Sequence, residues 1–185
     1  MKRCTLAIVL VLLSIGIFAE TYAQRKVGIG VTVGESVSIG LVPIPMYGAA
    51  VFYAVTPSIH AGLHLGFITG TSSGDSKAFD NLTAIEVAPY GKVIFGGLKD
   101  IRPFVKVSIA FINYSVKLPG SATEPGSSRD ESNSSLWGNV GLAYDVTKSI
   151  TLNGQLRFFD IGMTGKSKIS YFGLASPAIG LEIYL

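Results

Sequence analysis

Cysteine, charge and long hydrophobic runs are all scarce in this sequence. The only cysteine is Cys4, so no disulfide can form within the chain. Charged residues make up 15% of the chain and the formal net charge is +3, which is too small to indicate nucleic-acid binding. Outside residues 6–19, no apolar run approaches the about 20 residues that a membrane-spanning helix needs. These absences argue against three classes: disulfide-stabilised secreted domains, nucleic-acid-binding proteins and multi-helix membrane proteins.

The first 23 residues have the pattern of a secretory signal peptide. Lys2 and Arg3 precede the apolar run 6–19, and the small residues Thr21 and Ala23 lie three and one before the expected cleavage site. A lipoprotein signal does not fit, because Cys4 precedes the apolar run. Cleavage after Ala23 would leave residues 24–185, a chain of 162 residues (185 − 23) that we expect to form one domain.

The rest of the chain alternates apolar and polar residues with a period of two, which is typical of strands that separate two environments. The last segment is the clearest case, with Ile179, Leu181, Ile183 and Leu185 on one face. An apolar strand of this kind needs a partner at its edge, and pairing with the first strand would close a barrel. The pattern predicts eight strands at residues 25–34, 47–56, 59–69, 83–95, 102–112 (extending as far as 117), 136–146, 150–159 and 177–185. Pro89 predicts a bulge or irregularity in the fourth, because proline cannot donate a hydrogen bond to the ladder.

The connections between these strands alternate between long and short. Long polar loops are expected at 70–82, at 113–135 or 118–135, and at 160–173, together with a more apolar loop at 35–46. The short turns include an internal echo, in which Tyr-Ala-Val-Thr-Pro-Ser-Ile at 53–59 matches Tyr-Asp-Val-Thr-Lys-Ser-Ile at 144–150. Short turns at one end and long loops at the other are the plan of an outer-membrane barrel with both termini on the periplasmic side.

Charge lies on only one face of the expected strands. Every second residue, taken on the apolar face, gives 39 positions without a single charge, although 15% of 39 would be about six. The opposite face carries seven charged residues: Lys26, Glu86, Lys92, Lys106, Asp145, Arg157 and Glu182. A soluble barrel has apolar side chains inside, so apolar outside and charged inside favours an all-β, eight-stranded, antiparallel, up-and-down transmembrane barrel.

Aromatic residues near strand ends fit interfacial girdles in the same barrel. They are Tyr47, Tyr53, Phe67, Phe95, Tyr144, Phe158 and Tyr184. We expect Tyr90, Trp137, Arg157 and Phe159 to fill the lumen, because eight strands leave an interior that side chains can close.

These features resemble the small eight-stranded outer-membrane β-barrel proteins, the OmpA- and OmpX-like group. The resemblance rests on the Val-Thr-Pro-Ser-Ile turn at 55–59, on Pro103-Phe104-Val105 and on the alternating strand 177–185. It implies a location in the outer membrane. It also implies that strand 177–185 is read by the barrel-assembly machinery.

No residue pattern indicates a cofactor, a metal or catalysis. His60 and His64 are four residues apart on one strand, about 13 Å, so one metal ion cannot bind both. Hydrogen bonding in the lumen is the simpler interpretation. A lipid A-modifying enzyme is an alternative, but its serine–histidine site should lie near the long loops, whereas His60 lies at the opposite end. A narrow porin-like channel is a second alternative.

The sequence therefore predicts a monomeric structural or surface-interaction protein of the outer membrane. Its partners would be membrane lipid and lipopolysaccharide, with an extracellular ligand at loops 70–82 and 113–135. Inside the barrel, we expect Lys26 to lie near Glu182, Asp145 to offset Lys92 and Lys106, and Glu86 to pair with Arg157 across the lumen.

Overall fold

The computed structural model describes residues 27–37, 43–71, 80–96, 100–118, 126–164 and 170–185. The signal peptide expected at 1–23, Lys26 and most of loop 70–82 lie outside these ranges. The described part of the chain includes no helix that could cross a membrane.

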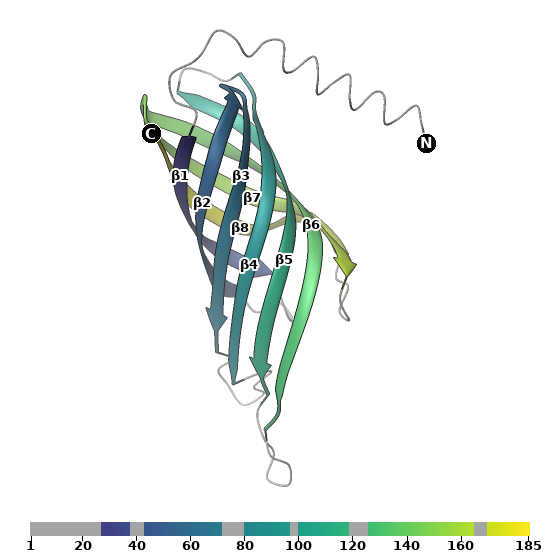
Figure 1. Ribbon diagram of the computed structural model, residues 1–185. Helices are drawn as coiled ribbons and strands as arrows, with labels where there is room; N and C mark the ends of the chain where they lie inside the picture. Colours follow the sequence, from purple (N-terminus) through teal and green to yellow (C-terminus); the bar gives the residue numbers. More distant parts are fainter. Residues whose placement is uncertain (1–26, 38–42, 72–79, 97–99, 119–125, 165–169) are drawn as a thin grey trace.

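Eight antiparallel strands form a closed up-and-down barrel, as the sequence predicts (Figure 1). They are β1 (Val27–Val37), β2 (Pro43–Thr56), β3 (Ile59–Gly70), β4 (Asn81–Ile94), β5 (Ile101–Lys117), β6 (Ser128–Thr147), β7 (Ile150–Thr164) and β8 (Ser170–Tyr184). Each strand pairs with its neighbour in sequence, and β1 pairs with β8 from Gly28↔Tyr184 to Gly34↔Ala178. The expected closure between the first and last strands is therefore confirmed.

The two short turns with matching sequences are stabilised in the same way. In the β2–β3 turn the Ser58 backbone N–H donates to Thr56 Oγ1 at 3.2 Å, and in the β6–β7 turn Ser149 N–H donates to Thr147 Oγ1 at 3.1 Å. A threonine that caps the amide two residues ahead is a local side-chain turn, so the repeated sequence specifies a repeated structure.

Three of the expected long loops are largely strand. Residues 35–37 of β1 pair with 43–45 of β2, and β5 and β6 pair without interruption as far as Lys117↔Ser128. Residues 160–164 belong to β7 and 170–173 to β8, and the two strands pair as far as Ile161↔Ser170. The predicted loop bounds 35–46, 113–135 or 118–135, and 160–173 were therefore wrong. Polar residues occupy the β5–β6 hairpin because both of its faces can meet water beyond the membrane-spanning part of the barrel.

The β5–β6 hairpin contains the two longest strands of the barrel. Seventeen strand residues in β5 correspond to a height of roughly 40 Å at ~3.3 Å per residue and a tilt of ~40°, whereas an outer-membrane apolar band is ~25 Å tall. This hairpin extends furthest at the end opposite the start of β1 and the end of β8 (Figure 1).

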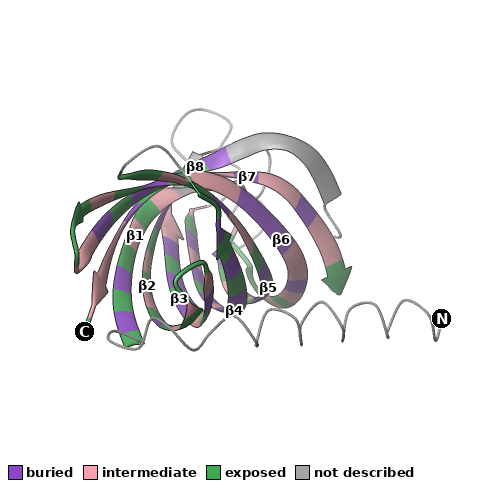
Figure 2. Cartoon of the chain, turned by 90° about the horizontal axis from the view of Figure 1, so that it is seen from above, coloured by how far each residue is buried: buried purple, intermediate pink, exposed green. Residues whose placement is uncertain are grey.

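Side chains alternate between a buried inner face and an exposed outer face along the strands (Figure 2). Large apolar side chains dominate the outer face: Ile85 and Leu142 are each 57% exposed and Ile179 is 70% exposed. The aromatic side chains of Tyr47, Tyr53, Phe67, Phe95 and Tyr144 are also exposed, at 44–49%. Pro89 leaves the register unchanged on both sides, so no bulge forms there, but the β4–β5 pairing is interrupted between Val87↔Phe111 and Tyr90↔Ser108, which is the expected irregularity.

A bulge occurs instead on β7. Gly138↔Phe159 and Asn139↔Arg157 are successive pairs with β6, which leaves Phe158 as an extra residue. Because the bulge shifts the alternation by one residue, Phe159 shares a face with the outward Gly138, and an added Cβ at Gly138 would lie 2.2 Å from its ring. The expectation that Phe159 fills the lumen was therefore wrong, and Asp160 points inward in its place.

Glycines on the inner face make room for large lumen side chains. A Cβ added to Gly48 would lie 2.1 Å from His64 Nε2, and one added to Gly62 would lie 2.6 Å from the Tyr90 ring. Both glycines thus let a long side chain from the next strand lie flat on the wall.

Candidate functional site

The lumen holds the chemically distinctive residues of this chain. The structure places six of the seven predicted lumen charges there, and the seventh, Lys26, lies outside the described residues. Two further charged residues that the sequence analysis missed, Arg102 and Asp160, join them.

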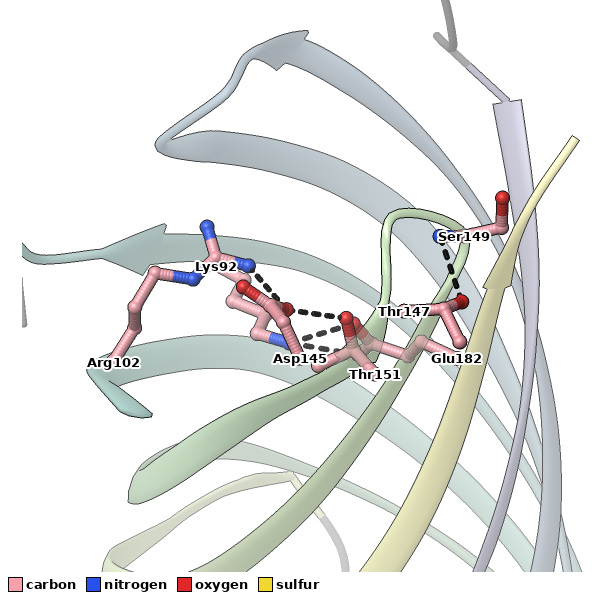
Figure 3. Close-up of polar contacts among 7 residues, drawn as sticks. All are labelled: Lys92, Arg102, Asp145, Thr147, Ser149, Thr151 and Glu182. Atoms are coloured by element: carbon pink, nitrogen blue, oxygen red, sulfur yellow. Dashed lines mark hydrogen bonds and ion pairs between the residues drawn. The ribbon is translucent and has the colours of Figure 1, made fainter. Parts of the chain in front are cut away.

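One ion pair crosses the barrel from wall to wall. Lys92 Nζ of β4 donates to both carboxylate oxygens of Glu182 of β8, at 2.7 and 2.9 Å (Figure 3). In an eight-stranded ring β4 and β8 lie on opposite sides, so this pair blocks the lumen. Lys92 is paired with Glu182 and not with Asp145, so the prediction that Asp145 offsets Lys92 was wrong. Lys26, the expected neighbour of Glu182, lies outside the described residues.

Nearer the short turns, Asp145 accepts hydrogen bonds from two groups at once. Arg102 donates from one side and Thr151 Oγ1 from the other, each at 2.7 Å (Figure 3). Alternation on β5 could have identified Arg102, since it shares the inner face with Lys106.

Arg157 and Asp160 form a second cluster further along the lumen. Their charged groups are 3.5 Å apart, and the Arg157 guanidinium lies 3.5 Å from the centre of the Trp137 ring. Residues three apart on a regular strand face opposite ways, so only the Phe158 bulge brings these two together. Nothing in the sequence signals that bulge.

Glu86 pairs with a histidine and not with Arg157, so the predicted Glu86–Arg157 pair was wrong. His64 Nδ1 and Glu86 Oε1 are 3.1 Å apart, and both side chains are almost fully buried. His64 on β3 is close because Glu86 on β4 pairs directly with Gly66, which is two residues from His64 on the same face of β3. The interpretation of His64 as a lumen hydrogen-bonding residue is confirmed.

His60 has an aromatic environment at the short-turn end of the lumen. Its ring stacks on Phe52 with centroids 5.3 Å apart, and the Tyr184 ring lies edge-on at 5.7 Å. Tyr184 therefore points inward, and its assignment to an outer girdle was wrong.

Packed side chains occupy both ends of the described lumen. The layer of Phe52, His60 and Tyr184 lies at the short-turn end, and an apolar cluster lies at the long-loop end. That cluster consists of Met46, Ile68, Leu82, Ala84 and Val116. Between them is a cavity of about 20 Å³, enough for one or two water molecules. Side chains therefore fill most of the barrel interior, as expected for eight strands.

The described lumen residues were compared with the donor sets of metal and serine–histidine sites. Across the described residues there is no group of three or more His, Cys, Asp or Glu side chains placed to hold a metal ion. No serine hydroxyl hydrogen-bonds to either histidine in that same part of the chain.

Comparisons with known proteins support the architecture. No family model and no curated protein sequence matches this chain. Solved structures do match: neisserial surface protein A (NspA) has a TM-score of 0.62 at 13% identity, covering 86% of this chain and 96% of NspA. The N-terminal barrel domain of Pseudomonas aeruginosa OprF scores 0.51 at 18% identity, covering 88% and 98%.

A third similar structure is Ail, the attachment invasion locus protein of Yersinia pestis. It scores 0.51 at 8% identity and covers 87% of this chain and 97% of Ail. Another Ail structure contains the heparin analogue sucrose octasulfate. At these identities the likeness concerns the fold. The chain has the fold of the small eight-stranded outer-membrane β-barrels.

Proposed function

We propose that this protein is an integral outer-membrane barrel that acts as a structural or surface-interaction protein through its long-loop end. One observation carries the proposal: the barrel is closed, its outer wall is apolar, and most of its described lumen charges form ion pairs inside a packed interior. An outer wall with Ile179 70% exposed and Leu142 57% exposed needs lipid around it.

The extended β5–β6 hairpin supports a role outside the membrane. Its outer face carries polar pairs, such as Ser132 Oγ donating to Asn113 Oδ1 at 2.6 Å. Tyr114 and Glu131 also hydrogen-bond across it. A hairpin about 15 Å taller than the apolar band presents these polar groups to the exterior.

The partners follow from this placement. Lipid and lipopolysaccharide would contact the apolar wall. The barrel-assembly machinery would read strand 177–185, after export by the signal peptide. An extracellular ligand would bind at loops 70–82 and 113–135, of which the second is mainly the hairpin. The barrel would work as a monomer, because its sheet has no open edge to share.

Adhesion is the more specific form of this proposal, since Ail, a fold relative, is an attachment protein. A narrow channel is less favoured, because packed side chains at both ends of the described lumen and the Lys92–Glu182 pair across it leave little open space. A lipid A-modifying enzyme is less favoured too, since His64 is engaged by Glu86 and not by a serine.

The decisive experiment combines location with phenotype. The protein should fractionate with the outer membrane and migrate differently in SDS before and after boiling. A deletion strain should then bind fewer host cells or leak a normally excluded dye. Recovery in the soluble periplasm without a mobility shift would contradict the proposed location. A deletion strain with normal adhesion and permeability would contradict the proposed role.

A further inference from the structure

The outer face of the wall formed by β4, β5 and β6 changes character along its height. On β5 the outward Val107, Ile109 and Phe111 are 42–50% exposed, as in a lipid-facing wall. Asn113 lies twelve residues above Ile101, where β5 begins (113 − 101). That is roughly 30 Å along the barrel axis at ~3.3 Å per residue and a tilt of ~40°, whereas the apolar band is ~25 Å tall. Phe111 therefore marks the upper edge of the lipid, and the strands continue beyond it (Figure 1).

Above Phe111 the outer face of these three strands is polar. Alternation and register place eight polar side chains on it: Asn81 and Thr83 of β4, Asn113, Ser115 and Lys117 of β5, and Ser128, Asp130 and Ser132 of β6. All except Thr83 belong to exposed residues. Every side chain but that of Lys117 is short, so this surface, which we call the side face, is flat. With ~4.8 Å between neighbouring strands, it is roughly 10 Å wide.

The chemistry of the side face suits a ligand that is rich in hydroxyl groups. Serine and threonine hydroxyls and asparagine amides both donate and accept hydrogen bonds, as sugar hydroxyls do. Ser132 Oγ donates to Asn113 Oδ1 at 2.6 Å, which orients both groups before a ligand binds. The eight residues include one cation, Lys117, and one carboxylate, Asp130. Their charges sum to zero, so a polyanion gains no net attraction from this face.

The position of the side face indicates which molecule meets it. It points sideways, in the same direction as the lipid-facing wall below it, because both are the outer face of the same strands. The groups that lie against it are therefore the head groups of the lipids whose acyl chains contact Phe111 and the wall beneath. In an outer leaflet made of lipopolysaccharide, these head groups are sugars.

We propose that the side face binds the core oligosaccharide of the surrounding lipopolysaccharide, and that it recognises sugar hydroxyls and not phosphate. This inference rests on the outer-membrane location proposed above and adds a defined site to it. The apolar wall contacts the acyl chains of the glycolipid, and the side face contacts its sugars. The hairpin thus binds a component of its own membrane through this face.

The direct test titrates core oligosaccharide, released from lipid A, into the isotope-labelled mature chain folded in detergent micelles. Amide chemical shifts should change at residues 81–83, 113–117 and 128–132 and should stay constant in the short turns. Inorganic phosphate at the same concentration should leave all of these shifts unchanged. An equal response to phosphate, or no response of the side face to the oligosaccharide, would overturn the proposal.

Matched variants locate the site. Ser115→Leu and Ser132→Leu each replace a hydroxyl of the side face by a bulky apolar group, and each should weaken oligosaccharide binding by about tenfold. Ser58→Leu makes the same change in the exposed β2–β3 turn and should leave binding unchanged. Equal affinities in all three variants would contradict the site. Mobility in SDS before and after boiling reports barrel closure separately, so absent sugar binding with a normal mobility shift rejects the side face and not the proposed function.

Discussion

Lys92 and Glu182 form an ion pair between opposite walls of the barrel, in a site that contains little water. Lys92 is 2% exposed and the Glu182 side chain 13%. Removing one partner leaves a buried charge, whereas removing both can be close to neutral. The lumen pairs therefore depend on their partners more than surface pairs do.

A double-mutant cycle tests this dependence. Lys92→Met and Glu182→Gln should each lower the free energy of unfolding by about 3–5 kcal/mol, and the double variant should recover much of the loss. Urea unfolding of the barrel in lipid vesicles is the measurement. Lys117→Met is the control, because Lys117 is an exposed residue of the hairpin and its loss should change the free energy of unfolding by less than about 1 kcal/mol. Additive losses at 92 and 182 would mean that the two charges do not interact.

Leu142 tests the outer face at the residue scale. It lies five residues from the end of β6, about 13 Å along the barrel axis and near the middle of a ~25 Å apolar band. Leu142→Lys should therefore cost about 2–4 kcal/mol of unfolding free energy.

The matched control is Ser115→Lys, at an exposed outer-face position on the hairpin. It should change the stability little, because position 115 would lie above the lipid. Equal costs at 115 and 142 would contradict either the apolar band or the hairpin's projection beyond it.

At the element scale, the β7 bulge decides which side chains meet in the lumen. Phe158 is the extra residue. Arg157 and Phe159, on either side of it, pair with successive residues of β6 and so already face opposite ways, as neighbours in a regular strand do. Deleting it should let Arg157 and Phe159 alternate normally while Asp160 still points inward.

Deletion variants measure this directly. The chain lacking Phe158 should fold and keep its heat-dependent mobility in SDS. Leu152 lies in a regular part of β7. The chain that lacks it should fail to fold, because the β7 residues between the deletion and the bulge would turn from one face of the sheet to the other. Failure of the Phe158 deletion with success of the Leu152 deletion would show that the bulge is misplaced.

At the scale of the whole molecule, the two ends of the barrel differ. Ser127 lies at the end of the β5–β6 hairpin, and Lys148 lies in the short β6–β7 turn; both are exposed. If the long-loop end faces the exterior, only the first is accessible from outside the cell.

Single cysteines at these positions test the orientation. The expected mature chain has no cysteine of its own, so Ser127→Cys and Lys148→Cys each introduce one thiol. A membrane-impermeant maleimide should label position 127 on intact cells, and position 148 only after the outer membrane is opened. The reverse pattern would mean that the barrel is inserted the other way.

The sequence alone determined the strand number, the barrel closure and the inward direction of the charges. The strand number and the direction of the charges follow from a local period of two, which fixes the two faces of a strand wherever the alternation is unbroken. Closure follows because an apolar last strand needs a partner at its edge. Alternation also identified Glu86, Lys92 and Glu182 as lumen residues. The repeated Thr-x-Ser turns are equally local, because a threonine caps an amide only two residues away.

Only the tertiary structure decided which charges pair. Glu182 meets Lys92 because β4 and β8 face each other in the closed ring, and no spacing along the chain encodes that distance. Arg157 meets Asp160 because a bulge at Phe158 shifts the alternation, and β7 carries no sequence mark for it. The polar hairpin was predicted as loop because polarity usually marks a turn, whereas ladder hydrogen bonds hold this one as strand beyond the barrel wall. Pairing across a lumen and register between strands depend on contacts between residues far apart in the chain, and those contacts exist only once the barrel has closed.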